Sequence, residues 1–213
     1  MGIITKIEAQ KKNNDRVNIY VDEKFFMAIY KELVFTFNLK KGQEIDPNYL
    51  KNILDDEMYM KAKNKALNIL SKASQSEKQI KQKLSKDFDE DTIDRVLKFL
   101  QKYKFVDDED LANRIVSTNV NLNKYGKNKI KQNLYNKGID KNIIEQAIDE
   151  IDSDKELENA FYLAKKRYER VKNEDSRKAY QKIGNHLAYK GFNYDIIKKV
   201  LNKLFNDIDE YSC

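Results

Sequence analysis

The sequence has one cysteine, one proline, six glycines, one histidine and no tryptophan among its 213 residues. The lone cysteine, Cys213, cannot form an internal disulfide, which fits a reducing compartment. So few glycines and prolines leave little turn chemistry for an all-β fold, and we therefore expect mostly helices. No apolar run approaches the roughly 18 residues that a membrane span needs, and the N-terminus lacks the apolar core of a secretory signal. We expect a soluble cytoplasmic protein.

The scarcity of histidine and cysteine also argues against most catalytic and metal sites. A single histidine, His186, cannot build a multi-histidine metal centre or a Cys–His pair, and we interpret it as a structural or surface residue. The glycines never cluster into a phosphate-binding loop. The acidic run Asp107–Asp110 is better explained as the cap of a helix starting near Leu111 than as a metal site. We expect no enzyme, and hence no catalytic residue, no metal and no cofactor.

What the chain does contain is an apolar pattern that recurs three times. The copies align on Phe88, Ile139 and Phe192, which are 51 and 53 residues apart. Around each of them, apolar residues follow the spacing of two short helices, and a further apolar helix precedes each pair. The matching positions are Ile80, Leu84, Ile93, Val96, Leu97 and Leu100, then Ile130, Leu134, Ile144, Ala147, Ile148 and Ile151, then Ile183, Leu187, Ile197, Val200, Leu201 and Leu204. An Asp or Asn after each anchor is a good N-cap. The pattern predicts a three-helix unit repeated three times.

The first 50 residues follow a different pattern. The β-branched runs "IITKIEA" and "RVNIYVD" predict a hairpin, "KFFMAIY" a third strand, and "KELVFTFNL" is ambiguous. Asp46 and Pro47 predict the start of a helix that runs to about Leu54. The expected fold is mainly α, with tandem three-helix repeats stacked into an elongated curved body and a small N-terminal β-containing cap. The expected domains are 1–50 for the cap and 51–106, 107–153 and 154–213 for the repeats.

The middle helix of each repeat is rich in lysine and arginine. These positions are our candidates for partner or DNA binding: Lys81, Lys83, Lys127, Lys129, Lys131, Arg177 and Lys182. The plain alternative is a solvated lysine face in a chain with 41 Lys and Arg against 35 Asp and Glu. Recurrence in all three units favours a basic stripe for a long anionic partner, either nucleic acid or an acidic protein groove. Sequence-specific reading by a helix-turn-helix is weaker, because "DEDTIDRVLKFL" and "DKNIIEQAIDEI" would bring carboxylates to phosphates.

Three stretches resemble the RecX family, the regulatory proteins of the RecA recombinase. They are "ALNILSKASQSEKQIKQKL" (66–84), "FVDDEDLA" (105–112) and "GKNKIKQNLYNKGI" (126–139), in the family's order and spacing. Two positions depart from the family pattern: Asn133 stands where a Glu is usual, and Asn119 where an Arg is often found. The resemblance is carried mainly by residues 61–151.

The resemblance implies a non-enzymatic protein that binds the RecA filament on single-stranded DNA. There it limits recombinase, ATPase and co-protease activity in homologous recombination, DNA repair and the SOS response. The implied partners are the RecA filament and single-stranded DNA, contacted directly or through the filament, with no membrane. We expect a monomer. The residues alone leave open the alternative of an independent, non-sequence-specific nucleic-acid-binding helical repeat protein.

Overall fold

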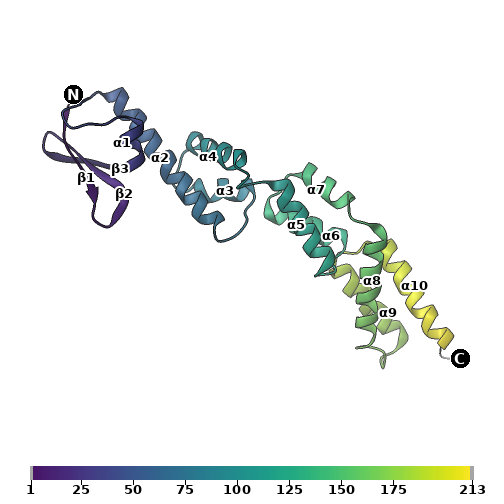
Figure 1. Ribbon diagram of the computed structural model, residues 1–213. Coiled ribbons are helices and arrows are strands. Elements are labelled where there is room, and N and C mark those ends of the chain that lie inside the picture. The colour runs from purple at the N-terminus through teal and green to yellow at the C-terminus, as the bar shows by residue number, and fades with distance from the viewer. Residues whose placement is uncertain (1, 212–213) are drawn as a thin grey trace. The chain divides into compact units, whose positions relative to one another are not determined.

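The structure, a computed structural model, describes residues 2–211, so Cys213 lies outside the described residues (Figure 1). The strands are β1 (Gly2–Gln10), β2 (Asn13–Val21), β3 (Lys24–Tyr30) and β4 (Glu44–Ile45). The helices of the described residues are α1 (Lys31–Thr36), α2 (Pro47–Leu70), α3 (Glu77–Leu84), α4 (Glu90–Lys102), α5 (Asp108–Asn121), α6 (Lys127–Lys137), α7 (Lys141–Asp149), α8 (Ser153–Tyr168), α9 (Ser176–Tyr189) and α10 (Tyr194–Tyr211).

The chain divides into two compact units. One contains the residues up to Ala73 together with Ile80–Phe105, and the other contains Ser74–Gln79 together with the residues from Val106 onward. The first unit therefore holds the sheet and most of the first repeat, and the second holds the other two repeats. The mainly helical fold with a small N-terminal sheet and three three-helix repeats is confirmed, while the elongated curved arrangement stays a prediction.

The N-terminal strands form one antiparallel sheet in the order β3-β2-β1-β4. Strands β2 and β3 are joined by Asp22 and Glu23, which both have positive φ, as the twist of a tight two-residue hairpin favours. Alternate β-branched residues point to the core, so that Ile4, Ile19 and Ile29 are fully buried. The sequence pattern predicted three of these strands and missed the two-residue β4.

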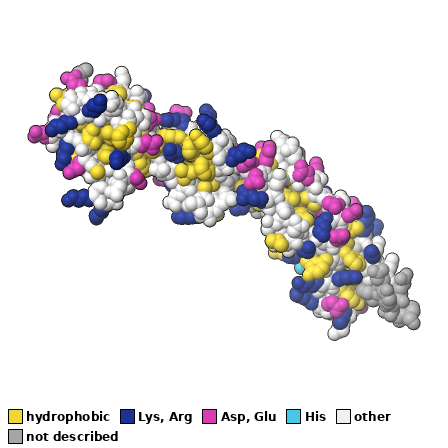
Figure 2. Space-filling view, viewed as in Figure 1, with side chains coloured by type: hydrophobic (Ala, Val, Ile, Leu, Met, Phe, Trp, Pro, Cys, Tyr) yellow, Lys and Arg dark blue, Asp and Glu magenta, His cyan; other side chains and the backbone are white. Residues whose placement is uncertain are grey.

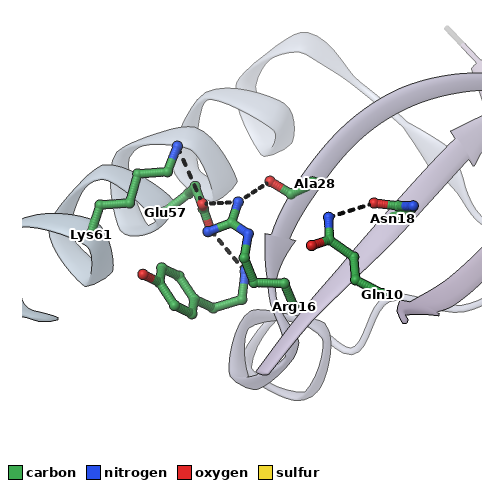
Figure 3. Close-up of polar contacts among 7 residues, drawn as sticks. Gln10, Arg16, Asn18, Ala28, Glu57 and Lys61 are labelled. Atoms are coloured by element: carbon green, nitrogen blue, oxygen red, sulfur yellow. Dashed lines mark hydrogen bonds and ion pairs between the residues drawn. The ribbon is translucent and has the colours of Figure 1, made fainter. Parts of the chain in front are cut away.

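A buried carboxylate joins the sheet to helix α2 (Figure 3). Glu57 is 2% exposed, and it accepts hydrogen bonds from Arg16 Nη2 at 2.7 Å and from the backbone N–H of Tyr30 at 2.8 Å. Arg16 also donates to the carbonyl of Ala28, and Lys61 Nζ lies 3.4 Å from the same carboxylate. Two cations and a backbone donor compensate the lost hydration of this charge, as burial of a carboxylate requires. Helix α2 is thereby tied to β2 and β3.

The repeat register is confirmed by burial. The anchors Ile139 and Phe192 are buried and Phe88 is half-buried, while Leu84, Leu134 and Leu187 at the end of the three middle helices are fully buried. The predicted N-caps are also confirmed for the third helices: the side chains of Asp89, Asp140 and Asn193 accept from backbone N–H groups of Thr92, Asn142 and Ile196.

Two predicted helix boundaries are wrong. Helix α2 starts at Pro47 with Asp46 as its N-cap, as predicted, but it continues past Leu54 to Leu70. Its sequence contains no glycine or internal proline to end it. Helix α5 starts at Asp108 rather than near Leu111, because Asp107 itself is the N-cap and accepts from the N–H of Asp110.

Candidate functional site

The middle helices α6 and α9 meet end to end in the second compact unit. The backbone N–H of Gly126, the N-cap of α6, donates to the carbonyl of Lys190, the C-cap of α9, at 3.0 Å. The N–H of Asn128 donates to the carbonyl of Gly191 at 3.1 Å. Backbone N–H groups at the start of α6, which have no acceptor within that helix, thus donate to carbonyl groups at the end of α9, which have no donor within theirs. The positive end of one helix dipole lies against the negative end of the other.

Glycine is required on both sides of this junction. Gly191 has a φ of +92°, and a Cβ there would lie 2.3 Å from the backbone nitrogen and 2.4 Å from the Cβ of Lys129. A Cβ on Gly126 would lie 2.5 Å from the carbonyl carbon and oxygen of Gly191. The two backbones therefore approach more closely than any side chain would permit.

A buried carboxylate from α8 completes the N-terminus of α6. The N–H of Lys127 donates to Oε1 of Glu156 at 2.9 Å, and Glu156 is 4% exposed. The first turn of α6 has no acidic residue of its own, so the third repeat supplies the negative charge that a helix N-terminus favours.

The N-terminal residues of α3, which belong to the same compact unit, are held in the same way by the second repeat. Ser76 Oγ donates to the carbonyl of Lys137 at 2.5 Å, and the N–H of Glu77 donates to Oδ1 of Asp108 at 3.0 Å. Burial raises the pKa of Asp108, although the hydrogen bond from Glu77 opposes that shift. In both cases a carboxylate from the first helix of a repeat, Asp108 or Glu156, accepts from a backbone N–H at the start of a middle helix.

The seven predicted binding residues are divided between the two units. Lys81 and Lys83 belong to the first unit, and the other five belong to the second: Lys127, Lys129, Lys131, Arg177 and Lys182. Lys81 pairs with Glu90 at 2.9 Å and Lys182 with Glu174 at 2.6 Å. The hydrogen bond that Lys81 donates to Glu90 raises the pKa of Lys81. Both pairs are exposed, so they stabilise the fold little, but a carboxylate already accompanies each cation.

The three lysines of α6 are the better candidates. Lys127 and Lys131 are four residues apart and so lie on one face of the helix, and no ion pair in the described part of the chain joins either of them or Lys129 to a carboxylate. Lys129 Nζ lies 5.7 Å from the ring centroid of Tyr189, which is 74% exposed. A cation next to an open aromatic ring suits a nucleic-acid strand.

A second group of cations, which the repeat pattern did not predict, lies around the C-terminal end of α8. Lys166, Arg167 and Arg170 lie with Lys190 around His186, which is half-buried. Burial lowers the pKa of His186, and the positive charges of Lys190, Arg167 and Arg170 lower it further. The basic run "KKRYER" at 165–170 is its sequence signal, but this run lies outside the middle helices, where the recurring basic positions are.

Three of the four residues in the acidic run Asp107–Asp110 have a local structural role. Asp107 is the N-cap of α5, Asp108 accepts from Glu77, and Asp110 pairs with Arg114 at 2.9 Å. Between residues 2 and 206, Asn48 aside, the structure contains no group of three or more His, Cys, Asp or Glu side chains that could hold a metal ion. Nor does that stretch contain a helix that is both long and apolar enough to cross a membrane.

Comparison with known proteins assigns nearly the whole chain to one family. Family models match it in four consecutive pieces: the regulatory protein RecX N-terminal domain at residues 2–46, and the first, second and third three-helix domains of RecX at 62–100, 107–148 and 154–201. These pieces correspond to the sheet and to the three repeats.

Similar full-length proteins and solved structures carry the same name. The regulatory protein RecX of Clostridioides difficile is 70% identical over 99% of both chains, and that of Clostridium tetani is 43% identical over 94% of both. A crystal structure of regulatory protein RecX, 31% identical, has a TM-score of 0.78 and covers 95% of this chain. RecX from Lactobacillus salivarius, 34% identical, has a TM-score of 0.66 over 70% of this chain. The chain belongs to the RecX family of regulatory proteins.

Proposed function

We propose that this protein binds the RecA filament on single-stranded DNA and inhibits its recombinase, ATPase and co-protease activities in DNA repair and the SOS response. The observation that carries the proposal is the agreement of all four domains with RecX regulatory proteins along nearly the whole chain. It acts by binding, as a monomer in the cytoplasm, and without a cofactor.

The proposed contacts are the basic residues of the middle helices. Lys127, Lys129 and Lys131 are the principal ones, because their ammonium groups are not committed to carboxylates of the described chain. The candidate surface also includes Lys81, Lys83, Arg177 and Lys182, and it requires that the two compact units present their cations to the same partner. The dense anionic charge of a DNA strand within a filament is a suitable partner for such a surface.

A RecA activity assay tests the proposal directly. The protein is titrated into RecA assembled on circular single-stranded DNA, and ATP hydrolysis and strand exchange are followed. We expect both rates to fall at or below one molecule per RecA protomer. No change at stoichiometric amounts would contradict a role at the filament, and an increase would contradict inhibition.

The alternative is an independent nucleic-acid-binding protein that acts on DNA alone. Its support is the exposed Tyr189 beside Lys129, a pair that would suit a bare strand as well as a filament. A competition experiment distinguishes the two functions. Excess free single-stranded DNA, added after filament assembly, should relieve the inhibition if the protein inhibits by sequestering DNA. Inhibition that persists under this excess supports binding to the filament itself.

A metal-dependent nuclease is the remaining catalytic possibility. The proposal expects no Mg²⁺-dependent cleavage of single- or double-stranded DNA, since Asp107, Asp108 and Asp110 have structural partners. Cleavage that disappears in the double variant Asp107→Ala with Asp108→Ala would contradict the non-enzymatic role.

A further inference from the structure

A small basic cavity lies between α8 and the end of α9. Its volume is about 200 Å³, and it is lined by Leu163, Lys166, Arg167, Arg170, His186 and Lys190. In Figure 2, dark blue lysine and arginine side chains lie beside the cyan histidine. The middle-helix cations proposed above do not line it, so it is a separate feature of the third repeat.

Apart from Leu163 and His186, every residue that lines the cavity is a lysine or an arginine. Lys166, Arg167 and Arg170 come from one turn of α8 and the residues just after it, and Lys190 comes from the C-cap of α9. Among the residues that line the cavity there is no carboxylate. Four like charges this close repel one another and favour a bound anion.

One of these cations has a hydrogen-bond donor left over. Arg167 Nε is buried and has no acceptor within the described part of the chain. A buried polar group without a partner is rare in folded proteins and calls for an explanation such as a missing ligand. The planar guanidinium offers its donors in a fork that matches the oxygens of a phosphate.

Two exposed tyrosines lie close in the chain to residues that line the cavity, one on each helix. Tyr162, which is 53% exposed, stands one helical turn before Lys166, and Tyr189, which is 74% exposed, directly precedes Lys190. Sites for single-stranded nucleic acid combine cations that hold the backbone with aromatic rings on which bases stack. An acidic protein segment would pair with the cations but has no bases to stack on the tyrosine rings.

We propose that this cavity binds a backbone phosphate of single-stranded nucleic acid, with Arg167, Arg170 and Lys166 as its phosphate ligands. Tyr162 and Tyr189 then support the bases on either side. The site continues to the basic helix α6, because Lys129 lies over Tyr189 and Lys190 Nζ lies 4.9 Å from the ring centroid of Tyr125. For its biological role this inference rests on the proposed function. It adds to that function a direct contact between this chain and a backbone phosphate of the strand.

The single histidine provides a direct readout without RecA. In protein prepared without a histidine tag, every imidazole NMR resonance belongs to His186. An anion in the cavity stabilises the charged imidazolium, so the pKa of His186 should rise when the strand binds. The probes are an oligothymidylate, inorganic phosphate and an oligoglutamate of similar charge. We expect the oligothymidylate to raise the pKa at the lowest concentration.

Charge-neutralising variants locate the site. The double variant Lys166→Gln with Arg170→Gln should abolish the histidine shift and weaken oligothymidylate binding. The slope of log affinity against log salt should fall by about 0.7 for each phosphate that the variant no longer neutralises. The control double variant Lys165→Gln with Lys172→Gln removes the same charge from the same segment outside the cavity, and it should keep the histidine shift.

The outcomes separate this inference from the filament role. It is overturned if the oligothymidylate leaves His186 unchanged in the wild-type protein, if the oligoglutamate binds more tightly, or if both double variants weaken binding equally. The wild-type titration decides even if a variant fails to fold. A normal His186 response with no effect on RecA would refute the proposed function alone, and RecA inhibition with a silent His186 would refute the cavity alone.

Discussion

Leu134 packs in the apolar core of the second repeat with Leu111 and Ile144, and none of its surface is exposed. We expect Leu134→Ala to lower the free energy of unfolding by about 2–5 kcal/mol, because the change removes buried methyl groups and leaves a cavity. Urea denaturation measures this. The neighbouring Tyr135→Ala, at a 45% exposed position, should change it by no more than about 0.5 kcal/mol. Similar losses from the two substitutions would be incompatible with the repeat register.

Asp108 offers a test of the caps between repeats. Asp108→Ala removes the acceptor for the N–H of Glu77 and should lower the free energy of unfolding by about 1 kcal/mol, as removal of a helix cap does. Asp108→Asn keeps an oxygen acceptor and should cost less. The exposed neighbour Glu109→Gln is the control.

The Asp108 carboxyl also gives the sign of a pH effect. Burial raises its pKa in the folded chain above the unfolded value, so the folded state holds this proton more tightly. Its contribution to stability is therefore present at low pH and is lost as pH rises through the folded pKa. The Asn variant should gain stability relative to wild type across the same rise, measured by urea denaturation at a series of pH values. A relative loss would show that the hydrogen bond from Glu77 outweighs burial.

The two positions that depart from the family pattern contact each other. Asn133 Nδ2 donates to Oδ1 of Asn119 at 3.2 Å, and Asn119, which is buried, donates its own amide to the carbonyl of Ile115 at 2.7 Å. The resemblance places an acidic and a basic residue at these positions, and here a neutral hydrogen-bonded pair replaces them. In this chain the two positions therefore join α5 to α6 through a hydrogen bond between neutral side chains.

At the scale of the element, the length of α2 could not be predicted from its apolar pattern. Its first half packs on the sheet through Ile53, and its second half packs on the first repeat through Ala62 and Ala66. One helix that serves two cores has no single apolar stripe, so its start was predictable from Asp46 and Pro47 but its length was not. The Glu57 network, with Arg16 41 positions away, depends on tertiary contact and has no local signal.

The repeats were predictable because each short helix serves one core and has its own caps. The basic helices were visible for the same reason, since their positions recur relative to Ile80, Ile130 and Ile183. Their end-to-end contacts were not visible. The recurring Lys-Gly at 137–138 and 190–191 marks the helix ends, but only the structure shows that the backbone at Gly191 lies against the start of α6.

The junction of α6 and α9 gives a prediction at this scale. Gly191→Ala should destabilise the fold by clearly more than Gly42→Ala. Both glycines have positive φ, +92° and +86°, so both substitutions incur the left-handed strain of roughly 1–2 kcal/mol. A methyl group at Gly42 meets open space, whereas at Gly191 it collides with the backbone of Lys129.

Denaturation of the two glycine variants gives the energies, and hydrogen exchange locates the damage. The amides of Gly126 and Asn128, which donate across the junction, should exchange faster in Gly191→Ala. In Gly42→Ala their exchange rates should be unchanged. Equal destabilisation by both substitutions would mean that backbone strain alone, and not the close approach, requires glycine at 191.

At the scale of the whole molecule, charge of both signs is spread over the surface. Acidic and basic side chains are interspersed on the face shown in Figure 2, and 41 cations against 35 anions leave a net charge of only +6. Attraction between exposed charges is largely screened beyond about 8 Å at physiological ionic strength. Net charge is therefore a weak driving force, and binding to an anionic partner must come from close contacts at particular cations.

The triple variant Lys127→Ala, Lys129→Ala and Lys131→Ala tests whether binding is local. Their side chains are half-buried, but the junction around them is made by backbone atoms, so thermal stability should change little. Filament binding, measured by the concentration that halves RecA ATPase activity, should weaken and become less sensitive to salt. The control triple Lys6→Ala, Lys11→Ala and Lys12→Ala removes the same charge from the β-containing cap and should have the smaller effect. Equal weakening by both triples would show that bulk charge, rather than the lysines of α6, carries the interaction.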